Sequence, residues 1–484
     1  MNSPDISKLL VEENKDIRAA MQVIMDNAQG ICFIINKEQK LTGILSDGDI
    51  RRLLLENYSL DTKISEVMNR NFVFYPIETE DEKIQKALNT RIRHIPLVDS
   101  NMKPLDYASL YKLRQYPIME PYLKGNELAY VTQCIKTNWI SSQGRFVTEF
   151  QEKMAKLCNA HYALATSSGT TALHLGLLSL KLPKGSKVMV PNLTFAASIN
   201  SILHAGLEPV LIDIEPETWN IDPEQIRKKI DNSTKAIMPV HLYGHPCNMS
   251  KIMDIAKDYK LYLIEDCAQA IGSSYSEKNV GSFGDIACFS FFGNKSVTTG
   301  EGGMVVFKNE GVYRYAKFLR DHGMDPHQKY WHLEVGYNYR MTNLQAAIGV
   351  AQLEYLDKIL LQKERIAKTY EKFLKDIPHI ILPIQRKGYK STYWLYTILI
   401  KPDFKMARDN IIQKLRQNGV DSRPIFYPLN QMPPYQKYAC GKDFPISQNI
   451  AKRGISLPSF LTLRERDINH ICLLLKKIQK FGAV

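Results

Sequence analysis

Two strand-like runs flank a single lysine in the stretch Ala287-Cys-Phe-Ser-Phe-Phe-Gly-Asn-Lys-Ser-Val-Thr-Thr-Gly-Glu-Gly-Gly-Met-Val305. Lys295 follows Gly-Asn, and a glycine cluster closes the bend before the second apolar run, Met304 to Phe307. Burial at such a bend would disfavour the ammonium form, lower the pKa of the lysine and leave a free amine able to form a Schiff base. The alternative is a solvated loop lysine, which is the ordinary environment of this residue type.

A carboxylate and an amide follow another strand-like run upstream, Leu261-Tyr-Leu-Ile-Glu-Asp-Cys-Ala-Gln269. Asp266 stands where the run ends, and Gln269 comes three residues later. A pyridoxal phosphate site needs an anion beside its Schiff-base lysine, because a carboxylate against the pyridinium nitrogen keeps that nitrogen protonated and lets the ring accept electrons. A single Asp after a strand also serves as a helix N-cap, so Asp266 taken alone does not indicate a cofactor site.

A phosphate seat is predicted earlier still, in Ala163-Leu-Ala-Thr-Ser-Ser-Gly-Thr-Thr-Ala-Leu-His-Leu175. The strand runs into Ser-Ser-Gly-Thr and then a helix, whose free backbone N–H groups and positive end favour an anion. Many helices start this way. The phosphate turn, the strand-end Asp and the glycine-flanked Lys in this order, however, together predict a pyridoxal phosphate site.

Residues of about 116 to 484 resemble the sugar-nucleotide aminotransferases of the DegT/DnrJ/EryC1/StrS family, and within it the branch that makes GDP-perosamine. The resemblance implies an α/β chain of the fold type I aminotransferases, with a mostly parallel sheet and a small C-terminal α+β domain. The matching stretches are Thr137-Asn-Trp-Ile-Ser-Ser-Gln-Gly144, Pro239-Val-His-Leu-Tyr-Gly-His-Pro-Cys247, Ile264-Glu-Asp-Cys-Ala-Gln269, Ser290-Phe-Phe-Gly-Asn-Lys295, Gly300-Glu-Gly-Gly303 and Gly336-Tyr-Asn-Tyr-Arg-Met-Thr-Asn343.

The resemblance also implies a role for each matching residue. Lys295 would form the Schiff base with pyridoxal 5′-phosphate, Asp266 would face the pyridine nitrogen, and Gln269 would reach the ring hydroxyl. Phe195 matches an aromatic that stacks on the ring, although an ordinary core Phe is the alternative. Asn338 matches a residue that contacts the phosphate from the neighbouring subunit, which implies a homodimer with composite active sites. The implied phosphate contacts within the subunit are Gly169, Thr170 and Ser290.

With 484 residues and 44% hydrophobic content, the chain is long enough for at least two units. Strand-like and helical runs alternate between Ala163 and Ile264, which predicts a doubly wound sheet with ligands at the carboxyl ends of its strands. A long helical stretch, Thr342 to Asp376, precedes a strand at Trp394 to Ile400. We expect a regulatory module at 1–114, a large cofactor-binding domain at 115–350 and a small domain at 351–484.

The N-terminal module contains an internal duplication. The stretch from Gly30 to Ser46 pairs with that from Arg93 to Ser109, each half offering a helix, a strand, a polar turn and a second strand. It resembles a tandem pair of CBS modules, which often bind adenine nucleotides. Within Gly43-Ile-Leu-Ser-Asp-Gly-Asp49, Ser46 and Asp49 match the ribose-contacting pattern. The second repeat departs from it, with Asp106 in place of the usual Gly and with Ser109 and Lys112 at the site positions, so at most one ribose site is expected. The alternative is a module for packing or dimerisation only.

Charge and cysteine usage bound the partners. A net charge of +13 suits an anionic partner, and with no basic arm or nucleic-acid motif we expect phosphorylated small molecules rather than nucleic acid. The eight cysteines form no CxxC pair, which predicts reduced thiols without a disulfide frame or metal site. The N-terminus lacks an apolar signal and no run reaches bilayer length, so we expect a cytoplasmic protein with no membrane partner.

The expected reaction moves an amino group from glutamate to the 4-keto carbon of a nucleotide-linked 4-keto-6-deoxy sugar, foremost GDP-4-keto-6-deoxymannose. The perosamine branch often has His where Asn430 stands, so a UDP-linked 4-keto sugar, of the bacillosamine or legionaminate type, is an alternative substrate. A sensor that kept the cofactor fold without turnover is a further alternative. A related branch of the family has His in the lysine position and removes a hydroxyl, and Lys295 argues against that outcome.

Overall fold

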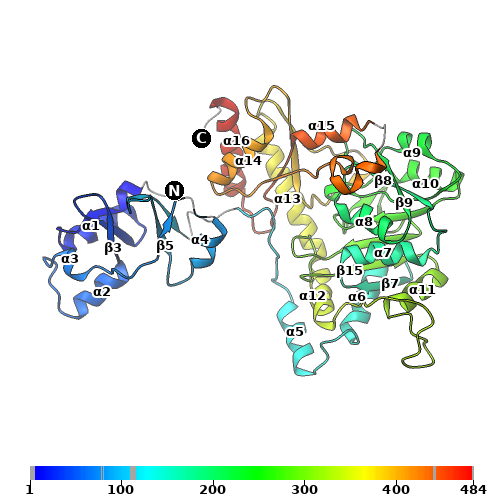
Figure 1. The fold of residues 1–484 in the computed structure, drawn as a ribbon, viewed down its shortest axis with the longest axis horizontal. Coiled ribbons are helices and arrows are strands. Elements are labelled where there is room, and N and C mark those ends of the chain that lie inside the picture. The colour runs from blue at the N-terminus through cyan, green and yellow to red at the C-terminus, as the bar shows by residue number, and fades with distance from the viewer. Residues whose placement is uncertain (1–5, 78, 80, 110–115, 440–442, 482–484) are drawn as a thin grey trace. The chain divides into compact units, whose positions relative to one another are not determined.

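The computed structural model describes residues 6–77, 79, 81–109, 116–439 and 443–481 (Figure 1). The chain divides into two compact units, unit 1 at Met1–Tyr116 and unit 2 at Pro117–Val484. The prolines of the connector that begins with Tyr116-Pro therefore stand where one unit gives way to the other. The division into three domains stays a prediction.

Unit 1 repeats one arrangement twice. In each half the first strand pairs parallel to the second and the second pairs antiparallel to the third, with a register shift at Ile34/Ile35 in one half and at Leu97/Val98 in the other. The elements are η1 (Ile6–Leu9), β1 (Leu10–Glu12), α1 (Ile17–Asn27), β2 (Ile31–Ile35), β3 (Leu41–Ser46), α2 (Asp47–Leu55) and α3 (Ile64–Val67), then β4 (Tyr75–Pro76), α4 (Asp81–Ala87), β5 (His94–Val98) and β6 (Pro104–Ser109). The matching shifts fit the duplication inferred from the sequence.

One small core joins the two halves of unit 1. Leu9, Phe33 and Leu41 from the first half pack with Val98 and Tyr107 from the second. The rings of Phe33 and Tyr107 meet edge to face at 6.0 Å between centroids, a favoured geometry for aromatic pairs. Neither half buries this surface alone, so the two repeats fold as one unit.

A seven-stranded sheet in the order β7-β15-β14-β11-β10-β8-β9 organises unit 2 (Figure 1). Its strands are β7 (Tyr162–Thr166), β8 (Lys187–Pro191), β9 (Glu208–Ile212), β10 (Thr234–Ile237), β11 (Tyr262–Asp266), β14 (Ile286–Ser290) and β15 (Gly303–Phe307). Only β15 runs antiparallel to its neighbours within this sheet. The predicted mostly parallel sheet of an α/β chain is confirmed.

Helices cover both faces of this sheet, and successive strand residues alternate between them. Met304 and Val306 face the layer of α6 (Arg145–Leu157) and α12 (Asn343–Glu354), whereas Val305 and Phe307 face α7, α8 and α11. The remaining helices of the large sheet are α5 (Glu127–Lys136), α7 (Gly169–Ser179), α8 (Ala196–His204), α9 (Pro223–Lys229), α10 (Met249–Asp258) and α11 (Glu310–Arg320). Burial on both faces explains why these strands are apolar throughout.

The C-terminal part of unit 2 builds a second, antiparallel sheet in the order β16-β18-β20-β19. Its elements are α13 (Leu356–Leu374), β16 (Ile380–Ile381), β18 (Tyr396–Ile400), α14 (Arg408–Gln417), β19 (Arg423–Pro424), α15 (Pro445–Arg453), β20 (Gly454–Leu457) and α16 (Glu465–Phe481), and a small ribbon joins β12 (Ser274–Tyr275), β13 (Lys278–Asn279) and β17 (Tyr389–Lys390). The short helices are η2 (Leu242–Gly244), η3 (Leu429–Gln431) and η4 (Pro433–Tyr438).

Two predicted strands are shorter in the structure than the sequence indicates. The run that was predicted to be a strand from Trp394 becomes β18 only at Tyr396, and Trp394 instead borders a cavity. The apolar run Ala236 to Val240, for which the sequence also predicts a strand, ends as β10 at Ile237, and Val240 pairs with Asp266 only as an isolated bridge. No helix within the described ranges has the length and apolar character needed to cross a bilayer.

Candidate active site

A cavity of about 490 Å³ opens where the strands of the large sheet end and the C-terminal part of unit 2 begins. Asp266 is the last residue of β11 and Ser290 the last of β14, while α7 and α8 start just after β7 and β8. Parallel strands bring their carboxyl ends to one edge, which is why positions far apart in sequence meet here. The lining includes these predicted residues: Gly169, Thr170, Phe195, Asp266, Gln269, Ser290 and Lys295.

Lys295 lies on the bend after β14, where its N–H donates to the carbonyl of Phe292 at 2.9 Å. Its Nζ lies 3.9 Å from the centroid of the Trp394 ring. Burial lowers the pKa of Lys295 to about 8, against the opposing effect of the Asp266 charge. About a tenth of this amine is then unprotonated at pH 7, far more than for an ordinary lysine. The side chain has the nucleophilic form that Schiff-base chemistry needs.

Asp266 is held by hydrogen bonds inside the cavity wall. The hydroxyl of Ser198 donates to Oδ2 at 2.7 Å, and the N–H of Ala268 donates to Oδ1 at 3.1 Å. Burial raises the pKa of Asp266, while these hydrogen bonds and the charge of Lys295 act in the opposite direction. A cationic group entering the cavity would therefore be drawn to this carboxylate.

The start of α7 forms an anion seat. Ser168 caps the helix in a reciprocal capping box with Thr171, and this leaves the N–H groups of Gly169 and Thr170 without a helix acceptor. A Cβ at Gly169 would lie 2.6 Å from the Cβ of Ser290, so glycine is needed for the helix to approach that hydroxyl. Two free N–H groups, a hydroxyl and a helix N-terminus together fit a phosphate group.

Gln269 and Phe195 border the space between the anion seat and the carboxylate. Oε1 of Gln269 accepts the N–H of Tyr243 at 2.8 Å, so its amide NH₂ is the end left to donate to a ligand oxygen. Phe195 is 58% exposed, which does not fit an ordinary core phenylalanine. With Lys295, Asp266 and the anion seat, these groups fit pyridoxal phosphate, and the individual roles stay predictions.

Two residues singled out from the sequence lie outside this lining. Asn338 is exposed and pairs with Asp321 in an isolated bridge. Asn430 accepts from Nδ2 of Asn192 at 2.9 Å, and its own N–H donates back to Oδ1 of the same residue. The Asn430 side chain is therefore engaged with the end of β8 and does not border the cavity.

One wall of the cavity is formed by aromatic residues that were not predicted from the sequence. The ring of Tyr243 stacks on Trp394 at 6.0 Å and on Phe426 at 5.3 Å between centroids. Nε1 of Trp394 donates to the carbonyl of Asn294, next to Lys295, at 2.7 Å. Arg423 adds a cation to the same lining. Tyr243 stands inside a quoted motif, but nothing in the sequence indicates that Trp394 reaches it.

In unit 1 the predicted ribose pair forms a helix cap. Ser46 is the N-cap of α2, its hydroxyl lies 2.6 Å from Oδ2 of Asp49, and the Asp49 N–H donates back at 3.2 Å. This capping box accounts for both side chains without a ligand. At the second repeat Ser109 is buried at the end of β6, and Lys112 lies outside the described residues. The nucleotide site stays a prediction.

Comparison with known proteins follows the division of the chain. The DegT/DnrJ/EryC1/StrS aminotransferase family model matches residues 121–476, and the CBS domain model matches residues 5–56. The GDP-perosamine synthase of Escherichia coli O157:H7 is 43% identical over 361 residues, covering 74% of this chain and 97% of that enzyme. That of Caulobacter vibrioides is 42% identical over 372 residues, covering 76% and 99%.

Solved structures agree with this placement. Helicobacter pylori PseC, an aminotransferase involved in pseudoaminic acid biosynthesis, superposes with a TM-score of 0.72 at 26% identity, covering 76% of this chain and 99% of that one. DesI, solved in the presence of its TDP-sugar product, gives 0.70 at 27% identity, covering 77% and 93%. Both resemblances inferred from the motifs are confirmed. The chain belongs to the DegT/DnrJ/EryC1/StrS family of pyridoxal-phosphate-dependent aminotransferases and carries a CBS domain at its N-terminal end.

Proposed function

We propose that this aminotransferase moves the amino group of glutamate to C4 of GDP-4-keto-6-deoxymannose and so makes GDP-perosamine. The observation that carries the proposal is the shared cavity of Lys295 and Asp266, an amine of lowered pKa and a buried carboxylate, beside an anion seat. The choice of sugar is supported by relatives named GDP-perosamine synthase, which are 41 to 43% identical over nearly their whole length.

Several residues of the cavity have a task in this reaction. Gly169, Thr170 and Ser290 would hold the cofactor phosphate, and Asp266 would keep a proton on the ring nitrogen. Bound pyridoxal phosphate supplies an electron sink for the charge left when a proton leaves the carbon next to nitrogen. Nζ of Lys295 takes that proton from the α-carbon of glutamate, and it later delivers one to C4 of the sugar. Phe195 would stack on the ring, and Tyr243, Trp394 and Phe426 border the same cavity.

The direct test is a coupled assay with glutamate and either GDP-4-keto-6-deoxymannose or a UDP-linked 4-keto sugar. The second substrate is included because a UDP-N-acetyl-3-dehydro-α-D-glucosamine 3-aminotransferase of Acidithiobacillus ferrooxidans is 35% identical. We expect amination of the GDP sugar, with 2-oxoglutarate formed in equal amount. Amination of the UDP sugar alone would overturn the proposed substrate, and no amination with either would favour a sensor.

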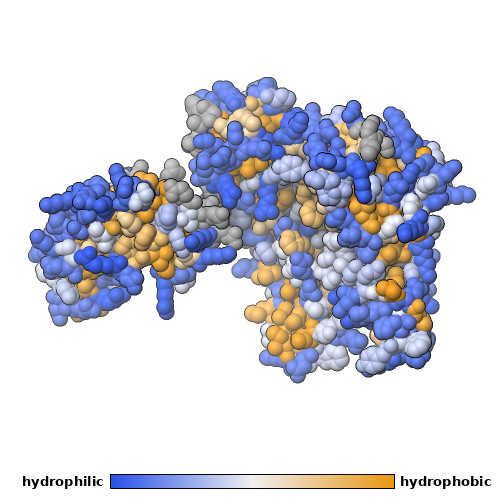
Figure 2. Space-filling view, in the orientation of Figure 1, coloured by the Kyte–Doolittle hydropathy of each residue, from blue (hydrophilic) through white to orange (hydrophobic). Residues whose placement is uncertain are grey.

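The enzyme is proposed to work as a homodimer in which Asn338 serves the partner's cavity. Figure 2 shows apolar side chains gathered over α5, where Leu128 and Ile135 are 80% and 59% exposed, and Trp139 follows with 58%. Exposed apolar surface of this kind is typical of an interface. Light scattering should give twice the chain mass, and Asn338→Ala should weaken cofactor binding. A monomer with full activity would contradict this.

The described cysteines are all unpaired and buried, which fits a reducing compartment such as the cytoplasm.

Unit 1 is proposed to bind an adenine nucleotide through Ser46 and Asp49. Titration of the full chain with ATP, ADP or AMP should show saturable binding that weakens in Asp49→Ala. Because this change also removes a helix cap, the control is Asp16→Ala, which removes the cap that Asp16 provides to Ala19 at the start of α1. Binding lost equally in both variants, or absent for all three nucleotides, would remove the site.

A further inference from the structure

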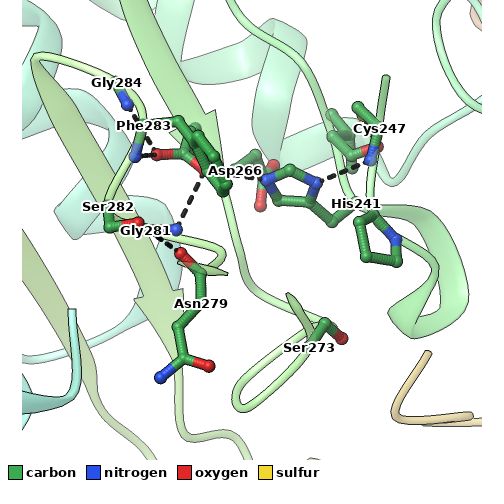
Figure 3. Close-up of polar contacts among 12 residues, drawn as sticks. His241, Cys247, Asp266, Ser273, Asn279, Gly281, Ser282, Phe283 and Gly284 are labelled. Carbon is green, nitrogen blue, oxygen red and sulfur yellow. Dashed lines mark hydrogen bonds and ion pairs between the residues drawn. The ribbon is translucent and has the colours of Figure 1, made fainter. Parts of the chain in front are cut away.

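A buried glutamate and histidine lie directly behind Asp266. Glu265 precedes Asp266 in β11, so the two side chains leave opposite faces of the strand. Oε2 of Glu265 lies 3.1 Å from Nε2 of His241, and both side chains are fully buried. Figure 3 shows the ring of His241 between Cys247 and the strand that carries Asp266. Neither residue lines the cavity, and the proposed reaction assigns neither a role.

The Glu265 carboxylate accepts four hydrogen bonds, as many as its two oxygens hold. Oε1 accepts the N–H groups of Phe283 and Gly284 at 2.8 and 2.7 Å, and Oε2 accepts the N–H of Gly281 at 2.9 Å besides His241. Burial alone would raise the pKa of Glu265, but the hydrogen bonds from His241, Gly281 and Gly284 outweigh it and lower this pKa. The group is therefore a carboxylate in the interior, which is found only where its charge is fully bonded.

The bonds of His241 fix its tautomer. Nδ1 accepts the N–H of Cys247 at 3.0 Å, so the proton stands on Nε2 and is donated to Glu265. The main-chain N–H of His241 also donates to the carbonyl of Asp266 at 3.1 Å. The histidine thus ties its own segment to the strand at two points.

A metal site made from the same groups is the alternative. Ligand atoms of His241, Glu265 and Cys267 lie within 4.8 Å of one another. An ion there would have to displace the bonds that already fill the carboxylate and both imidazole nitrogens. The cluster is a hydrogen-bond network.

We propose that Glu265, acting with His241, is a positioning residue that sets the spacing between the two anchor points of the cofactor; this rests on the proposed cofactor contacts. It joins three segments: β11 with Asp266, the His241–Cys247 segment with Tyr243, and the turn at 281–284 that leads into β14 and Ser290. The cofactor is a rigid ring with its nitrogen at one end and its phosphate at the other. β11 and β14 pair directly, with Asp266 opposite Cys288. Glu265 adds to this pairing by anchoring the turn before β14 and the His241–Cys247 segment, and both ends of the cofactor are engaged together only if these segments keep their places.

The first test is Glu265→Gln in the full chain, which is stripped of cofactor and titrated with pyridoxal phosphate. An amide accepts through one oxygen and presents an NH₂ group to backbone donors, so at least one segment loses its anchor. We expect cofactor affinity to fall at least tenfold, with a shifted visible absorbance band. The control is Asp213→Asn, which alters another buried carboxylate that accepts the N–H groups of Ile446 and Ser447, at 3.0 and 2.9 Å, away from the cavity. It should lower the Tm and leave the affinity unchanged.

Two variants of His241 test its two side-chain hydrogen bonds separately. They also provide the test if Glu265→Gln does not fold. His241→Gln keeps an N–H near the position of Nε2 and hence the bond to Glu265, whereas His241→Asn keeps an acceptor for Cys247 and loses the bond to Glu265. We expect Gln to retain near-normal affinity and Asn to behave like Glu265→Gln. Unchanged affinity and absorbance in all folded variants, with only the Tm lowered, would overturn the proposal. Cofactor titration involves no sugar, so failure of the proposed substrate would leave this test intact.

Discussion

Among the described residues of unit 2, burial lowers the pKa values of two lysines, Lys295 and Lys363, which lie in unlike surroundings. Lys295 borders the cavity at the edge of the large sheet, opposite the charge of Asp266, and has a pKa of about 8. Lys363, inside α13, is 1% exposed and has a pKa of about 7. Its Nζ donates to the main-chain carbonyls of Trp394 and Ser459 at 2.9 and 2.6 Å. A lowered pKa thus reports removal from water, and it does not by itself mark a reactive amine.

The two lysines differ in whether a ligand can reach the amine and in the charge of the groups beside it. Lys295 has space for a ring-sized molecule before it and a carboxylate across that space. The donors of Lys363 meet neutral groups, the two carbonyls and Sδ of Met119 at 3.0 Å, in a packed junction between α13 and the C-terminal sheet. The first arrangement is the one we propose to be reactive, whereas the second anchors the main chain of Trp394, whose ring lies over Lys295.

The largest effect should follow Lys295→Ala. Without an amine to move the proton, turnover should fall about 10⁴-fold or more, while the anion seat and Asp266 still bind the cofactor without covalent attachment. Single-turnover kinetics and the absorbance after dialysis measure both. Amination near the normal rate would contradict the mechanism and remove the distinction between the two lysines.

Asp266→Asn should come next. An amide does not hold the pyridine nitrogen protonated, so turnover should fall about 10³-fold with a smaller change in cofactor affinity. The control is Asp285→Asn, which changes an exposed carboxylate that accepts the N–H of Leu263 at 2.8 Å on the same strand. Equal losses in the two variants would indicate that the strand is disturbed and that the charge is not what matters.

The sequence was sufficient for the parts of the site that rest on strand ends. Lys295, Asp266 and Ser290 follow strand-like runs, and parallel strands deliver such positions to one edge. Trp394 was hidden because its run continues into β18, and local pattern does not tell where a strand begins. The role of Glu265 was not predicted from the sequence, because its partners are His241 and the turn at 281–284, which are distant from it along the chain.

In unit 1 a sequence pattern fits two different uses of the same side chains. The residues Ser46-Asp-Gly-Asp49 fit both a ribose-contacting pattern and a capping box, because a hydroxyl three residues before a carboxylate satisfies either. The structure contains the cap. The duplication and the two hairpin strands of each half were therefore predictable from the sequence, whereas the first strand of each half, β1 and β4, and the use of these two side chains were not.

Gly169→Ala should have a moderate effect on the cavity side of the comparison. Its Cβ would stand 2.6 Å from that of Ser290, so either α7 or Ser290 must move and the anion seat widens. Overpacking of about 1.4 kcal/mol corresponds to tenfold weaker cofactor binding. Gly311→Ala, in the exposed first turn of α11, is the control and should leave affinity unchanged. Unchanged affinity in Gly169→Ala would argue against a phosphate at this helix.

The smallest effect on turnover should come from Lys363→Met, which we expect to stay within about threefold, because Lys363 itself lies outside the cavity lining. Its effect on stability should depend on pH. The folded pKa of about 7 lies below the unfolded value of about 10.4, so the unfolded chain binds more protons between these values and the stability contributed by Lys363 rises with pH. At pH 9 the variant leaves two carbonyls without a donor and should melt about 5 °C lower than the unchanged enzyme. Below pH 7 the unchanged enzyme must bury an ammonium, so the gap should narrow.

Lys368→Met, which removes an exposed lysine on the same helix, should show no such trend. A gap that widens as the pH falls would mean that Lys363 is stabilised as a cation, and the contrast with Lys295 would then be wrong.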